Sequence, residues 1–368
     1  MSSKTKHIDK VLLFTVLSLL VFGLIIFLSA SLGLLARDGV KLGSVAFNQI
    51  FFGIFLGGIV CVTFANIPYR FLGAYSVWLY VIGIILTFAV FIPGIGITFN
   101  GAKRWIMLGP VSFQPSEFLK IAYILFLAMW FSSFKSKIQT FQFGLIPFLV
   151  ISGLAALPLI LQPDMDTTMI MLLAGSAMYL VAGADKRHLA ILAVIGLIGA
   201  GAVVAIKPYV LERITTFLNP AENSLTSGYQ IQQSLIAIGS GNIFGRGFGQ
   251  SVQKFNYLPE PTSDSIFAVA SEEFGFVGAL IIIALFFILF IRGIQLSNRS
   301  LDTFGGLVML GIVILIVSQS FLNIASMLGL FPLSGLPLLF ISKGGTALFF
   351  TLFATGIIFN ISRYQQKI

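Results

Sequence analysis

The sequence predicts an all-α polytopic membrane protein with about ten transmembrane helices and a large extracytoplasmic loop between helices 7 and 8. Three observations carry this prediction. Charged residues make up only 10% of the chain and apolar residues 57%, whereas about 25% of the residues of a soluble domain are charged. The apolar residues form long unbroken runs rather than alternating with polar ones, which favours spanning helices over barrel strands. Lysines and arginines gather between these runs, as they do beside cytoplasmic helix ends.

The apolar runs have the length of about 20 residues that a bilayer core requires. The first, Val11 to Leu35, carries no charge and is too long for a cleaved signal peptide, so we expect a spanning helix there. The uncharged run Thr303–Ser342 is too long for one helix, and the segment Gly329–Pro337 is expected to divide it. Spans are predicted at 11–32, 46–66, 74–93, 116–132, 144–161, 166–183, 188–206, 265–291, 304–328 and 338–361.

Ten spans would place both termini on the same side of the membrane. With the termini inside, twelve cations and three acids share the inner side, and ten cations and ten acids remain outside. Because cytoplasmic loops carry the excess of positive charge, we expect a multi-pass protein of the cytoplasmic membrane with cytoplasmic N- and C-termini. The inner cations are Lys4, Lys6, Lys10, Arg70, Lys135, Lys137, Lys186, Arg187, Arg292, Arg299, Arg363 and Lys367, and the inner acids are Asp9, Asp185 and Asp302.

Several classes of function are disfavoured by composition. The net charge of +9 comes from cations placed between apolar spans, which argues against a nucleic-acid partner. A single cysteine, Cys61, provides no disulfide framework. The only histidines are His7 and His188, both on the predicted inner side, so a zinc site is not expected. Neither a phosphate-binding loop motif nor a dinucleotide fingerprint occurs, and no organic cofactor is expected. Binding of Mg²⁺ or Mn²⁺ by carboxylates is kept as an alternative.

Residues 207–264 form a polar, Gly-rich loop far longer than an ordinary connection between two helices. Within it, Ser227 to Ile238 has helical apolar spacing and is expected to lie along the membrane surface. The run from Gly239 to Gly249 is expected to be a chain of turns that exposes backbone amides. No separate soluble domain is expected, and residues 1–368 are interpreted as one membrane domain.

Charged side chains within or beside spanning helices are candidate functional groups, because burying them unpaired in a membrane is costly. Each also has a purely structural interpretation. Glu117 and Lys120, one helical turn apart, would form a neutralising pair, and Lys103 and Arg104 would anchor the chain at the interface beside Trp105. Asp164 and Asp264 would cap the helices that follow them. Lys343 would extend to the outer interface, and Glu272 or Glu273 would pair with a lysine from another helix.

Taken together, these charges converge near the outer membrane face under a Gly-rich loop. Cations there would bind phosphate, and a carboxylate would transfer a proton. Such a combination suits the head group of an anionic lipid.

Several motifs resemble the SEDS family (shape, elongation, division and sporulation), in order and over essentially the whole chain. They are Gly101-Ala-Lys-Arg-Trp-Ile106, Gln114-Pro-Ser-Glu-Phe-Leu-Lys120, Gln162-Pro-Asp164, Gly245-Arg-Gly-Phe-Gly-Gln-Ser-Val-Gln-Lys-Phe-Asn-Tyr-Leu-Pro-Glu-Pro261, Asp264-Ser-Ile-Phe-Ala-Val269, Glu272-Glu-Phe-Gly275 and Pro337-Leu-Leu-Phe-Ile-Ser-Lys-Gly-Gly-Thr346. The run from Gln250 to Pro261 looks more like the cell-division branch of the family than its elongation branch.

The resemblance implies a peptidoglycan glycosyltransferase that polymerises lipid II at the outer face of the cytoplasmic membrane, for septal cell-wall synthesis in the division branch. It also implies a class B penicillin-binding protein as transpeptidase partner, together with other division proteins. By motif match Asp264 takes the family's essential carboxylate position, with a divalent cation as an open possibility. Positions near the proposed lipid II cavity are matched by Lys103, Arg104, Glu117, Lys120 and Arg246, and Lys343 is a further candidate cation there.

Three departures from the family pattern concern this region. The family usually has Thr-Asp-Phe where this chain has Ser263-Asp264-Ser265, and Ser-Tyr-Gly-Gly where it has Ser342-Lys343-Gly-Gly345. It also has Gln-Pro-Asp-x-Gly-Thr where this chain places Asp166 before Thr167. We expect the additional Lys343 and Asp166 to compensate each other electrostatically.

The proposed chemistry joins a sugar hydroxyl to an anomeric carbon whose leaving group is a lipid pyrophosphate. Asp264 would act as general base, and Lys103, Arg104, Lys120, Arg246 or Lys343, or a divalent metal, would stabilise the pyrophosphate. A helix N-terminus and neighbouring cations are expected to lower the pKa of Asp264. The alternatives are a flippase or transporter of lipid-linked precursors, an elongation-type polymerase and a non-catalytic scaffold.

Overall fold

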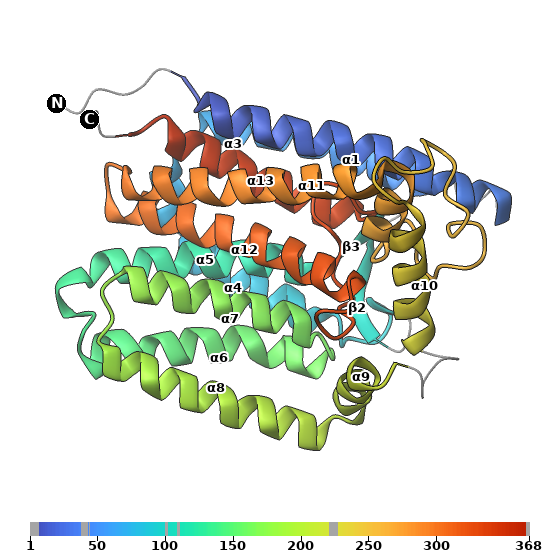
Figure 1. Ribbon diagram of the computed structural model, residues 1–368. Coiled ribbons are helices and arrows are strands. Elements are labelled where there is room, and N and C mark those ends of the chain that lie inside the picture. The colour runs from blue at the N-terminus through green and yellow to red at the C-terminus, as the bar shows by residue number, and fades with distance from the viewer. Residues whose placement is uncertain are drawn as a thin grey trace.

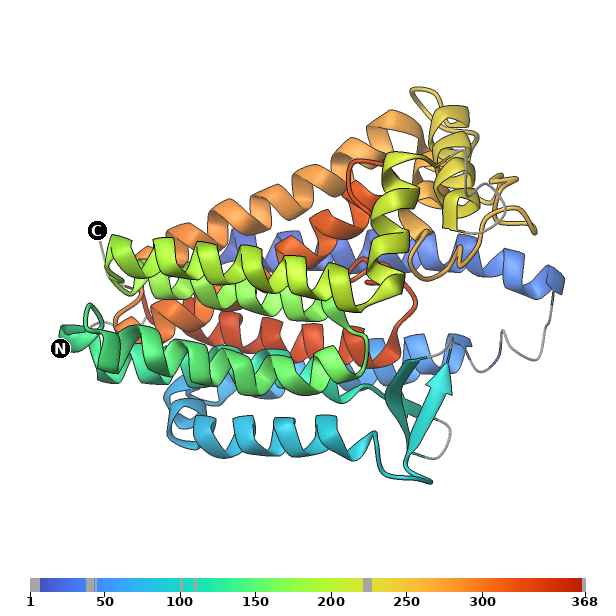
Figure 2. The same ribbon diagram turned by 90° about the horizontal axis from the view of Figure 1, so that it is seen from below.

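The computed structural model describes residues 7–37, 43, 45–99, 102–108, 111–220 and 227–365. Within these residues, nine helical segments are long and apolar enough to cross a membrane. A further apolar helix, α7 (Met165–Val181), is shorter than these nine. The segments run side by side in one bundle (Figures 1 and 2). The first and last spanning helices begin and end at the same end of the bundle, where the backbone N–H of Asp9 donates to Ser362 Oγ at 3.2 Å. The polytopic helical fold predicted from the sequence is confirmed.

The interior of the bundle is formed by its last two helices. In the most apolar stretch of α13 89% of the residues are buried, and in that of α12 78% are. In that of α8 none are, so α8 lies at the lipid-facing periphery. The segments besides α7 are α1 (Lys10–Arg37), the π-helical η1 (Asn48–Leu56) continued by α3 (Gly57–Asn66), α4 (Tyr69–Ala89), α5 (Pro115–Ser133), η3 (Phe141–Leu145) continued by α6 (Ile146–Leu161), α8 (Lys186–Ile206), α11 (Ile266–Asn298), α12 (Thr303–Met327) and α13 (Gly345–Ser362).

A small antiparallel sheet follows the third span, at the end of the bundle away from the termini (Figure 2). Its strands are β1 (Gly96–Phe99), β2 (Ala102–Leu108) and β3 (Val111–Phe113), in that order. These three short strands were not predicted from the sequence. The cations Lys103 and Arg104 adjoin Trp105, Ile106 and Met107 in β2, and this sequence lacks the strict alternation that predicts a strand.

The long polar loop contains two short helices, α9 (Pro208–Leu218) and α10 (Ser227–Ser240). The helix predicted from Ser227 is thus confirmed. It packs against α11 and α12 and lies across the end of the bundle, as Figure 1 shows. Between the two helices, residues 221–226 of the predicted loop lie outside the described part of the chain.

The helix α11 is broken at Gly275, which adopts φ 66° and ψ −165°. The break leaves backbone groups for the Gly-rich run to bind. Arg246 N–H donates to Glu272 O and Gly247 N–H donates to Glu273 O, both at 3.0 Å. A Cβ on Gly275 would lie 2.5 Å from Ile243 O, so only glycine allows this approach. The predicted turns are present, and these two amides bind the protein's own backbone.

The segment between α12 and α13 turns back at the same end of the bundle as the sheet. The predicted division of the run from Thr303 is confirmed, but α13 begins at Gly345 and not at residue 338, so residues 328–344 form an irregular connection. At its end a Cβ on Gly345 would lie 2.6 Å from Asn48 O. The start of α13 therefore packs directly on the backbone of η1.

Candidate functional site

A cavity of about 400 Å³ lies at the end of the bundle that carries the sheet. Its walls come from η1, β1, β2, the segment before α11 and the connection before α13. Seven residues were assigned to the lipid II site after the resemblance, and four of them line the cavity, namely Asp264, Lys343, Arg104 and Glu117. The polar lining also includes Asn48, Gln49, Ser112, Gln114, Asp164, Thr167, Glu260, Ser263 and Thr346.

Asp264 lies two residues before α11, on the cavity wall. The N-cap position of α11 belongs to Ser265, so the capping interpretation of Asp264 is wrong. Its carboxylate accepts a hydrogen bond from Ser263 Oγ at 3.1 Å. Its main-chain carbonyl accepts from Asn323 Nδ2 at 2.8 Å, which ties the segment to α12.

Burial raises the pKa of Asp264 to about 6. The Ser263 hydrogen bond opposes the shift, while the charges of Glu260 and Asp166 add to it. The expectation of a lowered pKa is therefore wrong, because desolvation of the carboxylate outweighs nearby cations such as Arg213. A carboxyl with this pKa is ionised at neutral pH and is a better proton acceptor than an ordinary aspartate.

Arg104 projects from β2 onto the turn before α7. Its Nε donates to Gln162 O at 3.2 Å, and its Nη2 donates to Pro163 O. Its Nη1 lies 3.5 Å from Asp164 Oδ1 in an ion pair. Asp164 occupies the N-cap position of α7 without a side-chain capping bond, so its carboxylate serves the ion pair and not the cap. The guanidinium thus fixes the sheet to the bundle.

Glu117 and Lys120 form a buried ion pair at the inner end of the cavity. Lys120 Nζ lies 2.9 Å from Glu117 Oε1 and 2.8 Å from Gln319 Oε1 of α12. Lys120 is 1% exposed and only Glu117 reaches the lining. The pair neutralises both charges within the helix bundle and joins α5 to α12.

Lys343 projects from the connection before α13, whose backbone is bonded to the Asp264 segment. Lys343 N–H donates to Thr262 O at 2.7 Å. Among the described residues Lys343 has no ion-pair partner. Asp166 instead pairs with Arg213 of α9 at 2.9 Å and accepts from Gly335 N–H at 3.3 Å. The expected compensation between Lys343 and Asp166 is therefore wrong, and Lys343 is a half-buried positive charge at the cavity.

Two predicted site residues lie elsewhere. Lys103 is exposed on β2 and is not among the described residues that line the cavity. Arg246 lies 3.5 Å from Glu272 Oε1 in an ion pair. The side chain of Arg246 therefore belongs to the contact between the Gly-rich run and α11.

A second buried ion pair was missed in the sequence. Lys254 and Glu273 are fully buried, and Lys254 Nζ lies 2.7 Å from Glu273 Oε1 and 3.0 Å from Ser29 Oγ of α1. A lysine partner for Glu273 was expected from another helix, and the structure supplies one from the loop. Lys254 lies within the polar loop, where a cation suggests solvent exposure.

Further polar residues were also missed, on the cavity wall and beside the segment that carries Asp264. Gln49 lies 2% exposed in η1, and Asn323 lies fully buried in α12. The signal in the sequence was their polarity within apolar runs, which is costly in a membrane unless the groups are paired. Glu260 gave no such signal, because it lies in a polar loop.

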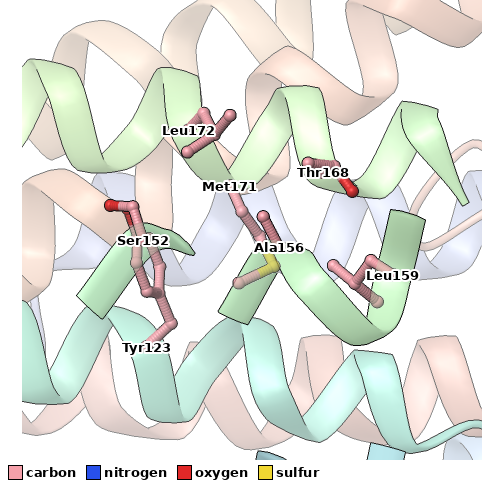
Figure 3. Close-up of a pocket in the computed structure, with 7 residues that line it drawn as sticks. All are labelled: Tyr123, Ser152, Ala156, Leu159, Thr168, Met171 and Leu172. Carbon is pink, nitrogen blue, oxygen red and sulfur yellow. The ribbon is translucent and has the colours of Figure 1, made fainter. Parts of the chain in front are cut away.

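A second interior gap, between α5, α6 and α7, offers no alternative site. It is lined by seven residues including Tyr123, Ser152 and Met171 (Figure 3), and its volume of about 0 Å³ leaves no room for a water molecule. Tyr123 and Ser152 hydroxyls lie 2.8 Å apart and satisfy each other. This gap is part of the packed interior.

Comparison with known proteins gave matches over almost the whole chain. The family model for cell cycle proteins of the FtsW, RodA and SpoVE type matches residues 10–367. Stage V sporulation protein E of Bacillus subtilis is 41% identical, with 100% of each chain covered. A protein of Trichlorobacter lovleyi named as a probable peptidoglycan glycosyltransferase FtsW is 37% identical over 96% of this chain and 93% of its own.

Two solved structures share the fold. One is a chain of a peptidoglycan synthase complex that coordinates polymerization and crosslinking. It has a TM-score of 0.79 and 26% identity, covering 97% of this chain and 98% of its own. The rod shape determining protein RodA of Thermus thermophilus has a TM-score of 0.70 and 24% identity, with 98% of both chains covered.

Proposed function

The chain belongs to the family of cell cycle proteins that includes FtsW, RodA and SpoVE, and from this membership we propose that it is a peptidoglycan glycosyltransferase that polymerises lipid II. The observation that carries the proposal is the joint placement of Asp264 and Lys343 on one cavity. An ionised carboxylate, and an ammonium that has no ion-pair partner among the described residues, suit a reaction that moves a proton and releases a pyrophosphate. Relatives that are 36–37% identical are named as glycosyltransferases.

In the proposed reaction a sugar hydroxyl attacks the anomeric carbon of lipid II. The new glycosidic bond forms as the bond to the pyrophosphate breaks, and the hydroxyl proton passes to Asp264. Because pyrophosphate is a good leaving group, the reaction does not need the second carboxylic acid that glycosidases use. The ammonium of Lys343 would stabilise the charge on the departing pyrophosphate.

A divalent cation, Mg²⁺ or Mn²⁺, is part of the proposal only in a restricted form. The described residues contain no group of three or more potential metal ligands, so a dedicated metal cage does not fit them. Mg²⁺ is often held by one or two carboxylates together with substrate phosphates. Asp264 and the pyrophosphate of lipid II would supply such ligands, and no step of the proposed reaction depends on the ion.

We propose that the cavity faces the outside of the cytoplasmic membrane and that both termini are cytoplasmic. This orientation is supported by the excess of cations predicted on the side of the termini. A class B penicillin-binding protein is the proposed partner. The likeness to a synthase complex that coordinates polymerization and crosslinking supports such a partner. We infer that the protein also binds other division proteins, because its sequence resembles the cell-division branch of the family.

For the cellular role we propose septal cell-wall synthesis. The run from Gln250 to Pro261 supports the division branch, and relatives named FtsW and a sporulation protein are all at least 35% identical. The alternative is an elongation-type polymerase. Complementation of Bacillus subtilis strains that lack SpoVE, FtsW or RodA separates the roles, since rescue of the RodA strain alone would contradict a septal role.

The rival function is transport of lipid-linked precursors across the membrane. Transporters usually bind their substrates near the bilayer midplane, between repeated halves of the fold. Here the cavity lies at one end of the bundle, which favours an enzyme. The buried pair Glu117 and Lys120 is the feature that suits a transport path, because it extends inward from the cavity.

The deciding experiment places the purified protein and its cognate transpeptidase in sealed vesicles, with labelled lipid II in the outer leaflet. Glycan chains are expected with the wild type and not with the Asp264→Asn variant. Movement of lipid II to the inner leaflet without chain growth would show a transporter. Chain growth by the Asp264→Asn variant at the wild-type rate would exclude the proposed base, and a scaffold would give neither growth nor movement.

A further inference from the structure

Gln49 binds both peptide groups that flank Lys343. It lies in η1 and is 2% exposed. Its Nε2 donates to Ser342 O at 3.0 Å, and its Oε1 accepts from Gly344 N–H at 2.9 Å. One side chain of the second span therefore fixes the backbone on both sides of Lys343, although nearly 300 residues separate them in the sequence.

The same short segment is bonded to the residues around Asp264. Lys343 N–H donates to Thr262 O at 2.7 Å, and Ser342 Oγ donates to Ser263 O at 2.7 Å. The backbone at Lys343 is thus held from one side by η1 and from the other by the segment that carries Asp264. The position of the ammonium relative to the carboxylate depends on both sets of bonds.

The local structure around Gln49 indicates that its bonds to the connection before α13 have a functional role. A glutamine in a spanning helix is costly unless its amide is fully bonded, and here both of its polar atoms bind the connection before α13. The residue lies in a π-helical segment, and such segments are rare and often occur at functional sites. Both Gln49 and Lys343 line the cavity.

We propose that Gln49 is a positioning residue that acts through Lys343, by holding its ammonium where the pyrophosphate of the lipid-linked substrate binds. This inference rests on the proposed transferase function. It assigns to η1 a role in binding substrate, and it predicts that the contribution of Gln49 exists only while Lys343 carries its charge.

A double-mutant cycle tests this dependence. The variants are Gln49→Ala, Lys343→Ala and the two together, and the measured quantities are kcat and KM for lipid II. Because Gln49→Ala leaves two backbone groups unpaired and releases the lysine, we expect KM to rise about tenfold with a smaller change in kcat. In the Lys343→Ala background the same substitution is expected to change KM less than about twofold. Equal effects in both backgrounds would overturn the proposal.

Asn360→Ala provides a matched control for loss of stability. Asn360 is a buried amide that, like Gln49, bonds one N–H and one C=O of another segment, Tyr69 N at 3.0 Å and Ala65 O at 2.8 Å. Those bonds lie at the opposite end of the bundle. The variant is expected to lower the melting temperature about as much as Gln49→Ala while leaving KM unchanged. A comparable rise in KM in the Asn360→Ala variant would show that the rise caused by Gln49→Ala comes from loss of stability alone.

A binding measurement separates failure of this inference from failure of the proposed function. Farnesyl pyrophosphate serves as the probe, titrated into the cycle variants built on Asp264→Asn, so that no turnover is needed. The Kd is expected to follow the same non-additive pattern as KM. If the wild type made no glycan, the transferase proposal would fail while this cycle still tested Gln49. Additive changes in Kd would overturn the inference even with an active enzyme.

Discussion

Asp264 and Lys343 carry opposite charges and face the same cavity, but they owe their chemical state to different surroundings. Burial raises the pKa of Asp264, whereas the side chain of Lys343 has no ion-pair partner among the described residues. Because burial makes the ionised form of the carboxylate costly, accepting a proton stabilises this side chain. An unpaired ammonium gains from an arriving anion. The two groups would therefore suit the proposed substrate, which brings a hydroxyl proton and a pyrophosphate to the same cavity.

The rate of polymerisation is predicted to depend on pH through Asp264. A pKa of about 6 means that the carboxyl is protonated below that value and can no longer accept a proton. The rate should therefore fall about tenfold per pH unit below about 6 and be level from about 7 upward. Initial rates with purified lipid II between pH 4.5 and 8 measure this. A fall centred near 4, as for an ordinary aspartate, would contradict the proposed burial of the base.

Four charged residues of the cavity lining could be predicted from the sequence, but their arrangement could not. Asp264, Lys343, Arg104 and Glu117 are charges near apolar spans, and that costly placement marks them individually. Gln49 carries no charge, and its importance depends on bonds to residues far away in the chain. The raised pKa of Asp264 likewise depends on burial, a tertiary property that motif and spacing do not contain.

Among the helices, α11 shows how a loop can complete a spanning segment. Its break at Gly275 exposes carbonyls that the Gly-rich run binds, and the acids Glu272 and Glu273 then bind the part of the loop that follows. Ser251 Oγ donates to Glu272 Oε2 at 2.6 Å. Apolar periodicity predicted one uninterrupted helix here, because a glycine between two phenylalanines leaves the apolar pattern intact.

Lys254 is predicted to be essential for the stability of this junction. Its ammonium lies 2.7 Å from Glu273 and 3.0 Å from Ser29, with both charged side chains fully buried. Lys254→Met would leave the carboxylate of Glu273 buried without its cation, which costs about 3 kcal/mol. Thermal unfolding of the detergent-solubilised protein should show a clear fall in Tm. The double variant with Glu273→Leu removes both charges and should recover most of the loss. A single variant as stable as the wild type would contradict a structural pair.

The whole molecule has two chemically different ends. At the end with the termini, the three acids predicted to lie inside each accept a backbone N–H at the start of a helix. Asp9 accepts from Leu12 at 2.9 Å, Asp185 from Arg187 at 2.8 Å and Asp302 from Gly305 at 2.7 Å. Their negative charges are therefore used in helix capping. The opposite end carries the cavity, the sheet and the amphipathic α10.

The orientation that follows can be tested with single cysteines. In a Cys61→Ser background, Phe244→Cys places a thiol at the cavity end, where Phe244 is 81% exposed, and Ser136→Cys places one in the exposed connection after α5 at the opposite end. A membrane-impermeant maleimide added to intact spheroplasts should label the cysteine at 244 and spare that at 136, with both labelled after permeabilisation. This result is expected because the cation-rich end stays in the cytoplasm. The reverse pattern would place the cavity inside the cell, where a polymerase of the extracellular wall could not use it, and would contradict both the topology and the proposed function.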